Sequence, residues 1–239
     1  MIVVRTHGGL GNQLFQIGRA LRLGADLGTP VARIHDIRYK VIFPASPVFG
    51  DLDRPVPAPL RALSVARLPK LLSRAGLAIE QVSIGRTRLL DGYFQAVADW
   101  QGDVAAVLAD FRTRLGIAEG GGGGTLVHLR LGDFFADEAA QRDHLAERLA
   151  VLPAGATLIS NRDDLLAPAV SLLAAGGFRH QATSDLSPEA LLRLMASFDR
   201  IESNDSTLAF WAAVLGRADM RFRLDRLQAL FETLRAGDR

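Results

Sequence analysis

The sequence predicts an α/β protein built from two Rossmann-like halves with parallel sheets. Short apolar runs alternate with segments of helical spacing along the chain, and this alternation is typical of parallel strands joined by crossover helices. A glycine-rich turn directly follows the first apolar run, as in many nucleotide-binding sheets. Consecutive glycines from Gly120 to Gly124 form the clearest linker. We therefore expect a first domain at residues 1–119 and a second at residues 120–239.

The first half is expected to open with a strand at residues 1–6, followed by the turn His7-Gly-Gly-Leu-Gly-Asn-Gln13. Apolar residues then recur at helical spacing up to Gly28, and a second strand is expected at residues 31–35. The other elements expected in this half are a helix at 60–77, a strand and turn at 88–95 and a helix at 100–115.

The second half repeats the same rhythm. The expected strands are residues 125–130, 156–160, 178–182 and 200–203, and the expected helices are residues 138–151, 163–175, 188–198, 207–215 and 224–234. The helix at 188–198 has the clearest start, because Ser187 can cap it, Pro188 suits its first position and Glu189 suits its first turn.

The composition argues against several classes of protein. Of the 239 residues, 49% are hydrophobic, yet no apolar run approaches the ~20 residues of a membrane-spanning helix. The chain has no cysteine, which fits a reducing compartment, and its first residues resemble a strand rather than a signal peptide. We therefore expect a cytoplasmic protein, with peripheral contact to the inner membrane as an open alternative.

Positive charge is concentrated in one part of a nearly neutral chain. The net charge is +2, but from Arg33 to Arg88 ten basic residues stand against four acidic ones. One interpretation is a helical insertion with a solvated basic face, which Pro69 favours because it interrupts any long amphipathic helix. The other is a surface for an anionic membrane or a phosphorylated acceptor. No basic run with interleaved aromatic residues occurs, so nucleic acid is not an expected partner.

A polar strand end dominates the second half. The apolar strand that starts at Thr125 carries His128 and Arg130 and ends near Asp133, and open α/β sheets bind ligands at the carboxyl ends of their strands. A guanidinium in this position suits a bidentate anion, most often phosphate. The alternative is a structural ion pair between Arg130 and Asp133, and the local sequence leaves both open.

Two further strands of the second half end in polar clusters. Asn161-Arg-Asp-Asp164 follows one strand and Ser203-Asn-Asp-Ser-Thr207 follows another. Each can be an ordinary helix cap, but three polar strand ends in one half, one of them with Arg130, favour a ligand site. The second cluster opens a helix and is rich in hydroxyl groups, so it suits a phosphate.

The glycine turn of the first half does not match a dinucleotide fingerprint. Counted from Gly9, Leu14 stands where the third glycine belongs, so an NAD-dependent enzyme is disfavoured. Asn12 and Gln13 each offer a donor and an acceptor, although Asn12 can alternatively cap the following helix. No His-Glu-x-x-His or Cys-His cluster occurs, and no metal site is expected.

Five segments together resemble the α-1,2-fucosyltransferases of glycosyltransferase family 11. Each segment is weak alone, but they occur in the family's order across most of the chain. The segments are Gly8-Gly-Leu-Gly-Asn-Gln13, Gly92-Tyr-Phe-Gln95, His128-Leu-Arg-Leu-Gly-Asp133, Ser160-Asn161 and Ser203-Asn-Asp-Ser-Thr-Leu-Ala-Phe-Trp-Ala212.

The resemblance implies a GT-B fold with two facing Rossmann-like domains, GDP-fucose as donor, inversion at the anomeric carbon, and no metal or other cofactor. The acceptor would be a galactoside hydroxyl, with an α-1,2 linkage, in surface polysaccharide synthesis. Arg130 would hold the β-phosphate and stabilise the departing GDP, because without a metal a fixed cation and amide donors must do so. The residues implied around the donor are Asn12, Gln13, His128, Arg130, Asn161, Asp163, Asn204, Asp205 and Ser206.

Some features of the site are left open by the resemblance. Leu131 stands where the family has a second arginine, so we take Arg130 as the essential one. A base for the acceptor hydroxyl is left open among Asp133, Asp137 and Glu138. Related core fucosyltransferases have an acid at the position of Glu138, although Asp137 and Glu138 can simply begin the next helix, where acids are favoured. Two other interpretations are the same fold with a different GDP-sugar, and a GDP-sugar-binding protein without turnover.

Overall fold

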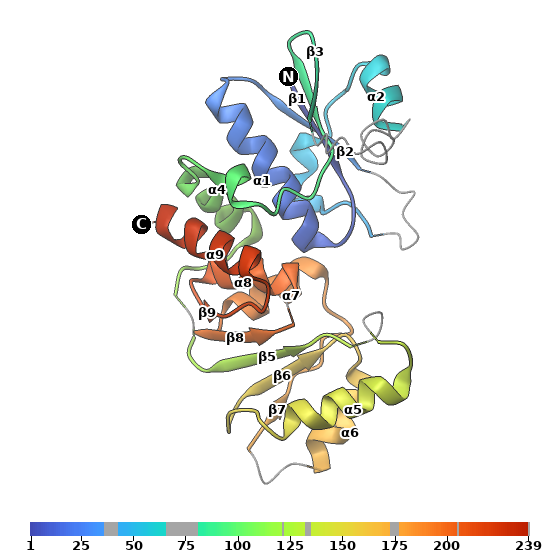
Figure 1. Cartoon of the computed structure of the whole chain (residues 1–239), viewed down its shortest axis with the longest axis vertical. Coiled ribbons are helices and arrows are strands. Elements are labelled where there is room, and N and C mark those ends of the chain that lie inside the picture. Colours follow the sequence, from blue (N-terminus) through green and yellow to red (C-terminus); the bar gives the residue numbers. More distant parts are fainter. Residues whose placement is uncertain are drawn as a thin grey trace. The chain divides into compact units, whose positions relative to one another are not determined.

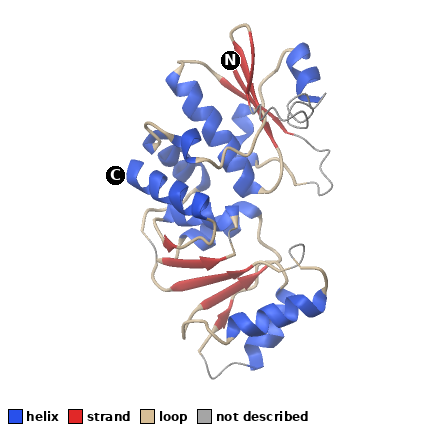
Figure 2. Ribbon diagram, in the orientation of Figure 1, coloured by secondary structure: helices blue, strands red, loops and turns tan. Residues whose placement is uncertain are grey.

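The computed structural model describes residues 1–35, 43–65, 81–120, 122–131, 135–172, 177–204 and 206–238. It contains two separate sheets, each combined with helices (Figures 1 and 2). The α/β class with parallel, Rossmann-like sheets is therefore confirmed. The facing arrangement of a GT-B fold stays a prediction. Among the described residues, no helix has the length and apolar character needed to cross a membrane.

The chain divides into two compact units. The first contains Met1–Arg114 and Glu232–Arg239, and the second contains Leu115–Phe231. This division differs from the expected domains, 1–119 and 120–239, in its boundary and in assigning the last residues to the first unit. An ion pair in the first unit accounts for the second difference, since Arg112 Nη1 donates to Asp238 Oδ1 at 2.8 Å and both side chains are buried.

The sheet of the first unit has the strand order β2-β1-β4-β3. Its strands are β1 (Ile2–Thr6), β2 (Val31–His35), β3 (Gln81–Ile84) and β4 (Thr87–Leu90). β1 pairs in parallel with β2 and β4, whereas β3 pairs antiparallel with β4. The sequence analysis did not predict β3, although its four residues alternate between polar and apolar.

The helices of the first unit include the one that follows the glycine turn. They are α1 (Leu10–Asp26), α2 (Ala58–Val65) and α4 (Ala105–Leu115), with 3₁₀ turns η1 (Pro47–Leu52) and η2 (Val97–Trp100). Gly9, not Asn12, stands at the N-cap of α1. α4 starts at Ala105 rather than at residue 100, where η2 ends. The helix predicted at 60–77 is represented by α2, and residues 66–77 lie outside the described residues.

The sheet of the second unit is entirely parallel, in the order β7-β6-β5-β8-β9. Its strands are β5 (Thr125–Leu129), β6 (Thr157–Ser160), β7 (Arg179–His180), β8 (Arg200–Ser203) and β9 (Asp219–Met220). In chain order this is 3-2-1-4-5, the arrangement of the nucleotide-binding Rossmann sheet. Only the two-residue β9 was not predicted.

Helices cover both faces of this second sheet (Figure 1). They are α5 (Glu138–Leu149), α6 (Asp163–Leu172), α7 (Pro188–Ala196) and α8 (Thr207–Gly216). A further helix, α9 (Asp225–Gly237), begins in the second unit, and its residues from Glu232 onward belong to the first unit. Apolar side chains of α5 and α6 form one core cluster with β5 and β6, whereas α8 packs on β8 and α7. The predicted start of α7 is confirmed, because Ser187 Oγ accepts a hydrogen bond from the backbone N–H of Ala190.

Candidate functional site

The crevice between β5 and β8 is the topological switch point of the second sheet. The chain runs from β5 outward to β6 and β7, then returns to the other side of β5 to form β8 and β9. Open α/β sheets bind ligands beside such a point, at the carboxyl ends of the strands. His128 and Arg130 lie at this end of β5, and Ser203 and Asn204 lie at this end of β8.

Arg130 follows a strand whose residues alternate between two environments. Val127, Leu129 and Leu131 belong to the core cluster that includes α5 and α6, so the alternate residues His128 and Arg130 belong to the opposite face. Leu131 is fully buried in that cluster. Its burial provides a physical reason for an aliphatic residue where the family has a second arginine.

His128 is a buried neutral group beside Arg130. Its Nδ1 lies 3.0 Å from the Oγ atom of Ser203 on the neighbouring strand. Burial, together with the positive charge of Arg130, lowers the pKa of His128 from 6.5 to about 4. His128 is therefore uncharged at neutral pH and can offer a hydrogen bond but no charge to an anionic ligand.

The low pKa of His128 predicts a pH dependence of stability. Above pH 6.5 neither the folded nor the unfolded protein protonates this residue, so it contributes no pH dependence. Between pH 6.5 and about 4 only the unfolded protein binds the proton, so the free energy of unfolding falls, by about 3 kcal/mol in total. Urea unfolding of the wild type and of His128→Gln should show this fall in the free energy of unfolding in the wild type alone. Parallel pH profiles would contradict it.

Asn161 holds the backbone next to Arg130. Its Oδ1 accepts from the N–H of Leu131 at 2.7 Å, and its Nδ2 donates to the carbonyl of Leu131 at 2.9 Å. On the other side of Arg130, Ser160 Oγ donates to the carbonyl of Leu129 at 2.7 Å. The structure thus assigns Asn161 a positioning role, and its contact with a nucleoside stays a prediction.

Asp163 is likewise engaged within the second unit. Its Oδ2 accepts from the N–H groups of Thr183 and Ser184, at 2.8 and 3.0 Å, and its Oδ1 lies 3.1 Å from His180 Nε2. Burial alone would raise the pKa of Asp163, but these hydrogen bonds outweigh burial and lower it. Asp163 therefore ties the start of α6 to β7 and the segment after it, and its nucleoside contact also stays a prediction.

The segment after β8 leads into α8. Ser206 is buried, and its hydroxyl caps α8 by accepting from the N–H of Ala209. Asn204 Nδ2 lies 3.4 Å from His144 Nε2. The capped N-terminus of α8 follows a strand that ends beside β5, and helix N-termini favour anions. This placement fits the predicted phosphate side of the site.

Two predicted residues, Asp133 and Asp205, lie outside the described residues. The alternative of an ion pair between Arg130 and Asp133 is therefore untested. Glu138 is described and is the exposed first residue of α5. Its Oε1 accepts from Arg142 Nη2 at 2.6 Å, one helical turn further on. The helix-start explanation accounts for this geometry, and a catalytic role for Glu138 stays a prediction.

In the glycine turn of the first unit, Gln13 is a structural residue. It is 1% exposed, and its Nε2 donates to the carbonyls of Gly8 and Pro44, both at 2.9 Å. Its Oε1 accepts from the N–H of Ser46 at 3.0 Å. We therefore omit Gln13 from the donor contacts proposed below. Asn12 is half-buried, and its Oδ1 accepts from Gln95 Nε2 at 3.3 Å.

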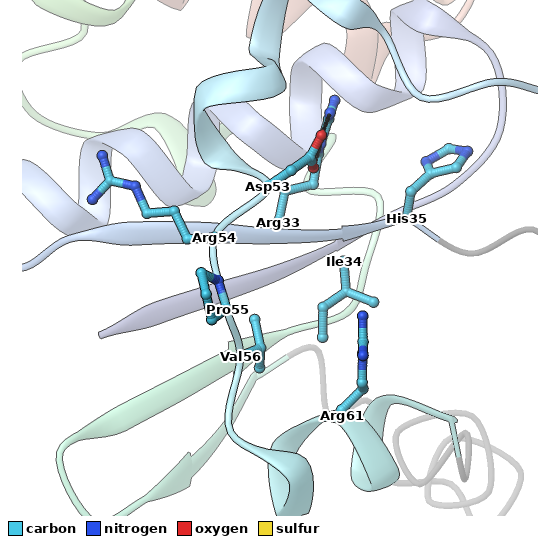
Figure 3. Close-up of a pocket in the computed structure, with 8 residues that line it drawn as sticks. All are labelled: Arg33, Ile34, His35, Asp53, Arg54, Pro55, Val56 and Arg61. Atoms are coloured by element: carbon cyan, nitrogen blue, oxygen red, sulfur yellow. Dashed lines mark hydrogen bonds and ion pairs between the residues drawn. The ribbon is translucent and has the colours of Figure 1, made fainter.

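The first unit also contains a cavity of about 480 Å³ at the edge strand β2 (Figure 3). It is lined by Arg33, Ile34, His35, Asp53, Arg54, Pro55, Val56 and Arg61. Arg33 is neutralised within it, because its Nε and Nη2 atoms donate to the two carboxylate oxygens of Asp53 at 2.8 and 2.6 Å. None of the predicted donor residues lines this cavity.

The sequence contains one Asp-x-Asp pattern, Asp51-Leu-Asp53, which is the type of pair that holds a metal in one class of sugar transferases. Here the carboxylates have cationic partners: Asp51 pairs with Arg114 and Asp53 with Arg33. The hydrogen bonds from Arg114 hold the pKa of Asp51 below its usual value. In the described part of the chain, no group of three or more His, Cys, Asp or Glu side chains could hold a metal ion.

The chain is thus an α/β protein of two units. The sheet of its second unit has the Rossmann strand order, and Arg130 lies at the switch point of that sheet. In comparisons, no protein-family model and no curated protein matches the chain. Among solved structures it is similar to NodZ α-1,6-fucosyltransferase co-crystallised with GDP, with 13% identity, TM-score 0.47, and 90% of this chain and 91% of that chain covered.

Two further structures of NodZ show similar identity, TM-score and coverage. The form soaked with GDP-fucose shows 14% identity and a TM-score of 0.47, covering 90% of this chain and 91% of that chain. Fucosyltransferase NodZ from Bradyrhizobium shows 13% identity and a TM-score of 0.47, covering 90% and 92%. We base the following proposals on the residues of the present chain.

Proposed function

We propose that this protein is an inverting fucosyltransferase that transfers L-fucose from GDP-fucose to a hydroxyl group of a glycan acceptor. One observation carries the proposal: Arg130 directly follows the central strand β5 at the switch point, and hydrogen bonds with Ser160 and Asn161 hold the backbone on both sides of it. The five-segment resemblance supports GDP-fucose as the donor. It also supports a galactoside acceptor, an α-1,2 linkage and transfer without a metal.

The chemistry requires a fixed positive charge where Arg130 stands. When the bond between fucose C1 and the β-phosphate oxygen breaks, its electron pair moves onto the diphosphate. The acceptor hydroxyl attacks C1 from the opposite face and gives its proton to a base, with Glu138 and Asp133 as the proposed candidates. A guanidinium oriented in advance stabilises the leaving diphosphate without reorganisation. The backbone N–H groups at the start of α8 would add to this effect.

An assay with GDP-fucose and a β-galactoside tests this function. The purified protein should release GDP and form a fucosylated product at the same rate with and without EDTA. The product's NMR spectrum should show an α-1,2 linkage, rather than the α-1,6 linkage named for NodZ. Binding of GDP-fucose without release of GDP would favour a GDP-sugar-binding protein without turnover. Faster transfer from another GDP-sugar would show that the donor is not GDP-fucose. Inhibition by EDTA would contradict metal independence.

A further inference from the structure

The first sheet has a switch point of its own, between β1 and β4. The chain leaves β1 through α1 to form β2, and later places β4 on the other side of β1. His7 directly follows β1 and Asp91 directly follows β4. Both residues therefore lie beside the crevice in which open α/β sheets bind ligands. Arg130 and the start of α8, which the proposed function uses for the donor, belong to the second unit.

A cluster of buried polar side chains lies at this switch point. Arg5 Nη1 lies 2.7 Å from Asp91 Oδ2, and both side chains are at most a tenth exposed. His7 Nε2 lies 3.9 Å from Asp91 Oδ1 and 3.2 Å from Gln16 Nε2. Because the charges of Arg5 and Asp91 cancel, this pair brings no net charge to the crevice. This cluster therefore suits a neutral polar ligand better than an ion.

Two exposed aromatic rings lie beside the glycine turn. Tyr93 is 40% exposed and Phe43 is 41% exposed. The ring of Tyr93 meets the ring of His7 edge-on, with centroids 4.9 Å apart. Phe43 lies against Gly9, since its Cε1 would be 3.7 Å from a Cβ atom at that glycine. Among the exposed large apolar side chains of the described residues, these two are the aromatic ones.

The backbone that presents Tyr93 is strained. Phe94 has a φ of +50°, a left-handed conformation that side-chain-bearing residues rarely adopt. It is held there by burial of its ring and by Trp100 Nε1, which donates to its carbonyl at 2.8 Å. Gln95 links the same segment to Asn12 of the glycine turn. This conformation buries Phe94 and leaves the neighbouring Tyr93 exposed, and such strain is concentrated at ligand sites.

We propose that Tyr93 and Phe43 form the contact surface for a neutral pyranose ring of the acceptor. The face of an aromatic ring carries partial negative charge, which complements the polarised C–H groups on one face of a pyranose. The polar edges of the sugar remain available to groups such as the Asn12 amide. Pockets for small molecules commonly combine aromatic walls with a few oriented polar groups. This inference rests on the proposed function, because it names the acceptor surface of the same reaction.

Acceptor kinetics test the surface directly. Tyr93→Leu should raise the KM for a β-galactoside about tenfold, and Phe43→Leu should raise it in the same direction. Tyr93→Phe should stay within twofold of wild type, because it keeps the ring. The KM for GDP-fucose and its acceptor-free hydrolysis should not change in any of these variants. Leu27→Ala removes another exposed apolar side chain of the first unit and should leave the acceptor KM unchanged. An unchanged acceptor KM in Tyr93→Leu would overturn the proposal.

A binding measurement separates this inference from the proposed function. Acceptor-free hydrolysis of GDP-fucose by the wild type reports on the donor reaction alone. Saturation-transfer NMR with methyl β-galactoside reports on the aromatic surface alone, and its signals should weaken in Tyr93→Leu but not in Leu27→Ala. A wild type that hydrolyses GDP-fucose but does not bind the galactoside would refute the surface and leave the donor reaction standing. Binding of the galactoside without hydrolysis of GDP-fucose would refute the donor reaction and leave the aromatic surface standing.

Discussion

Replacement of Arg130 by alanine should lower the kcat of fucose transfer by about 100- to 1,000-fold, the usual cost of removing one preorganised donor from a developing anion. The Kd for GDP-fucose should rise by a smaller factor, because the charge on the diphosphate grows as the bond to fucose breaks. Steady-state kinetics and GDP-fucose titration of the same preparations separate the two effects.

Two further variants make the Arg130 test specific. Arg130→Lys keeps the charge but loses the planar fork of donors, so its kcat should lie between those of wild type and Arg130→Ala. Arg86→Ala removes an exposed arginine in the β3–β4 turn and should leave kcat unchanged. If Arg130→Ala retained near-normal kcat with an unchanged melting temperature, the diphosphate assignment would be wrong.

Replacement of Gly216 by alanine should destabilise the second unit by about 3 kcal/mol or more. A Cβ atom there would lie 2.1 Å from the carbonyl oxygen of Ala196, and Ala196 is the last residue of α7. The obstacle is backbone rather than a flexible side chain, so the last turn of α8 must move away from α7. Alanine is a better helix former than glycine by only about 1 kcal/mol. The steric effect is larger, so the net change is a loss of stability.

Urea unfolding or a melting curve measures the effect of Gly216→Ala. The melting temperature should fall by roughly 10 °C for a protein of this size. Gly50→Ala is the matched control, because Gly50 is exposed and no atom lies within 4 Å of its added Cβ. That variant should stay within about 0.5 kcal/mol of wild type. Equal stability of the two variants would show that α7 and α8 pack less closely than the structure indicates.

Local sequence patterns were sufficient to predict most of the helices and strands. Periodicity and capping residues predicted the strand at β5 and the start of α7, because a buried strand and a capped helix each leave a pattern within a few neighbouring residues. The same reasoning missed β3 and β9. These elements have four and two residues and form by pairing with strands already in the sheet.

The candidate site was less predictable, because its residues are distinguished by contacts between distant parts of the chain. Gln13 followed the glycines as expected, but its amide bonds to Pro44 and Ser46, and no local pattern reveals this. Asn161 was correctly placed at a strand end, yet it bonds to the backbone of Leu131, 30 residues earlier. Leu131 is different: its burial follows from the alternation along β5, so its position in the core could have been inferred from sequence.

The ion pair between Arg112 and Asp238 has a consequence for synthesis on the ribosome. Residues 232–239 group with the first unit, but they are translated only after every residue of the second unit. The ion pair between Arg112 and Asp238 can therefore form only after the segment that carries Asp238 has been synthesised. The first unit is thus begun before the second unit but completed after it.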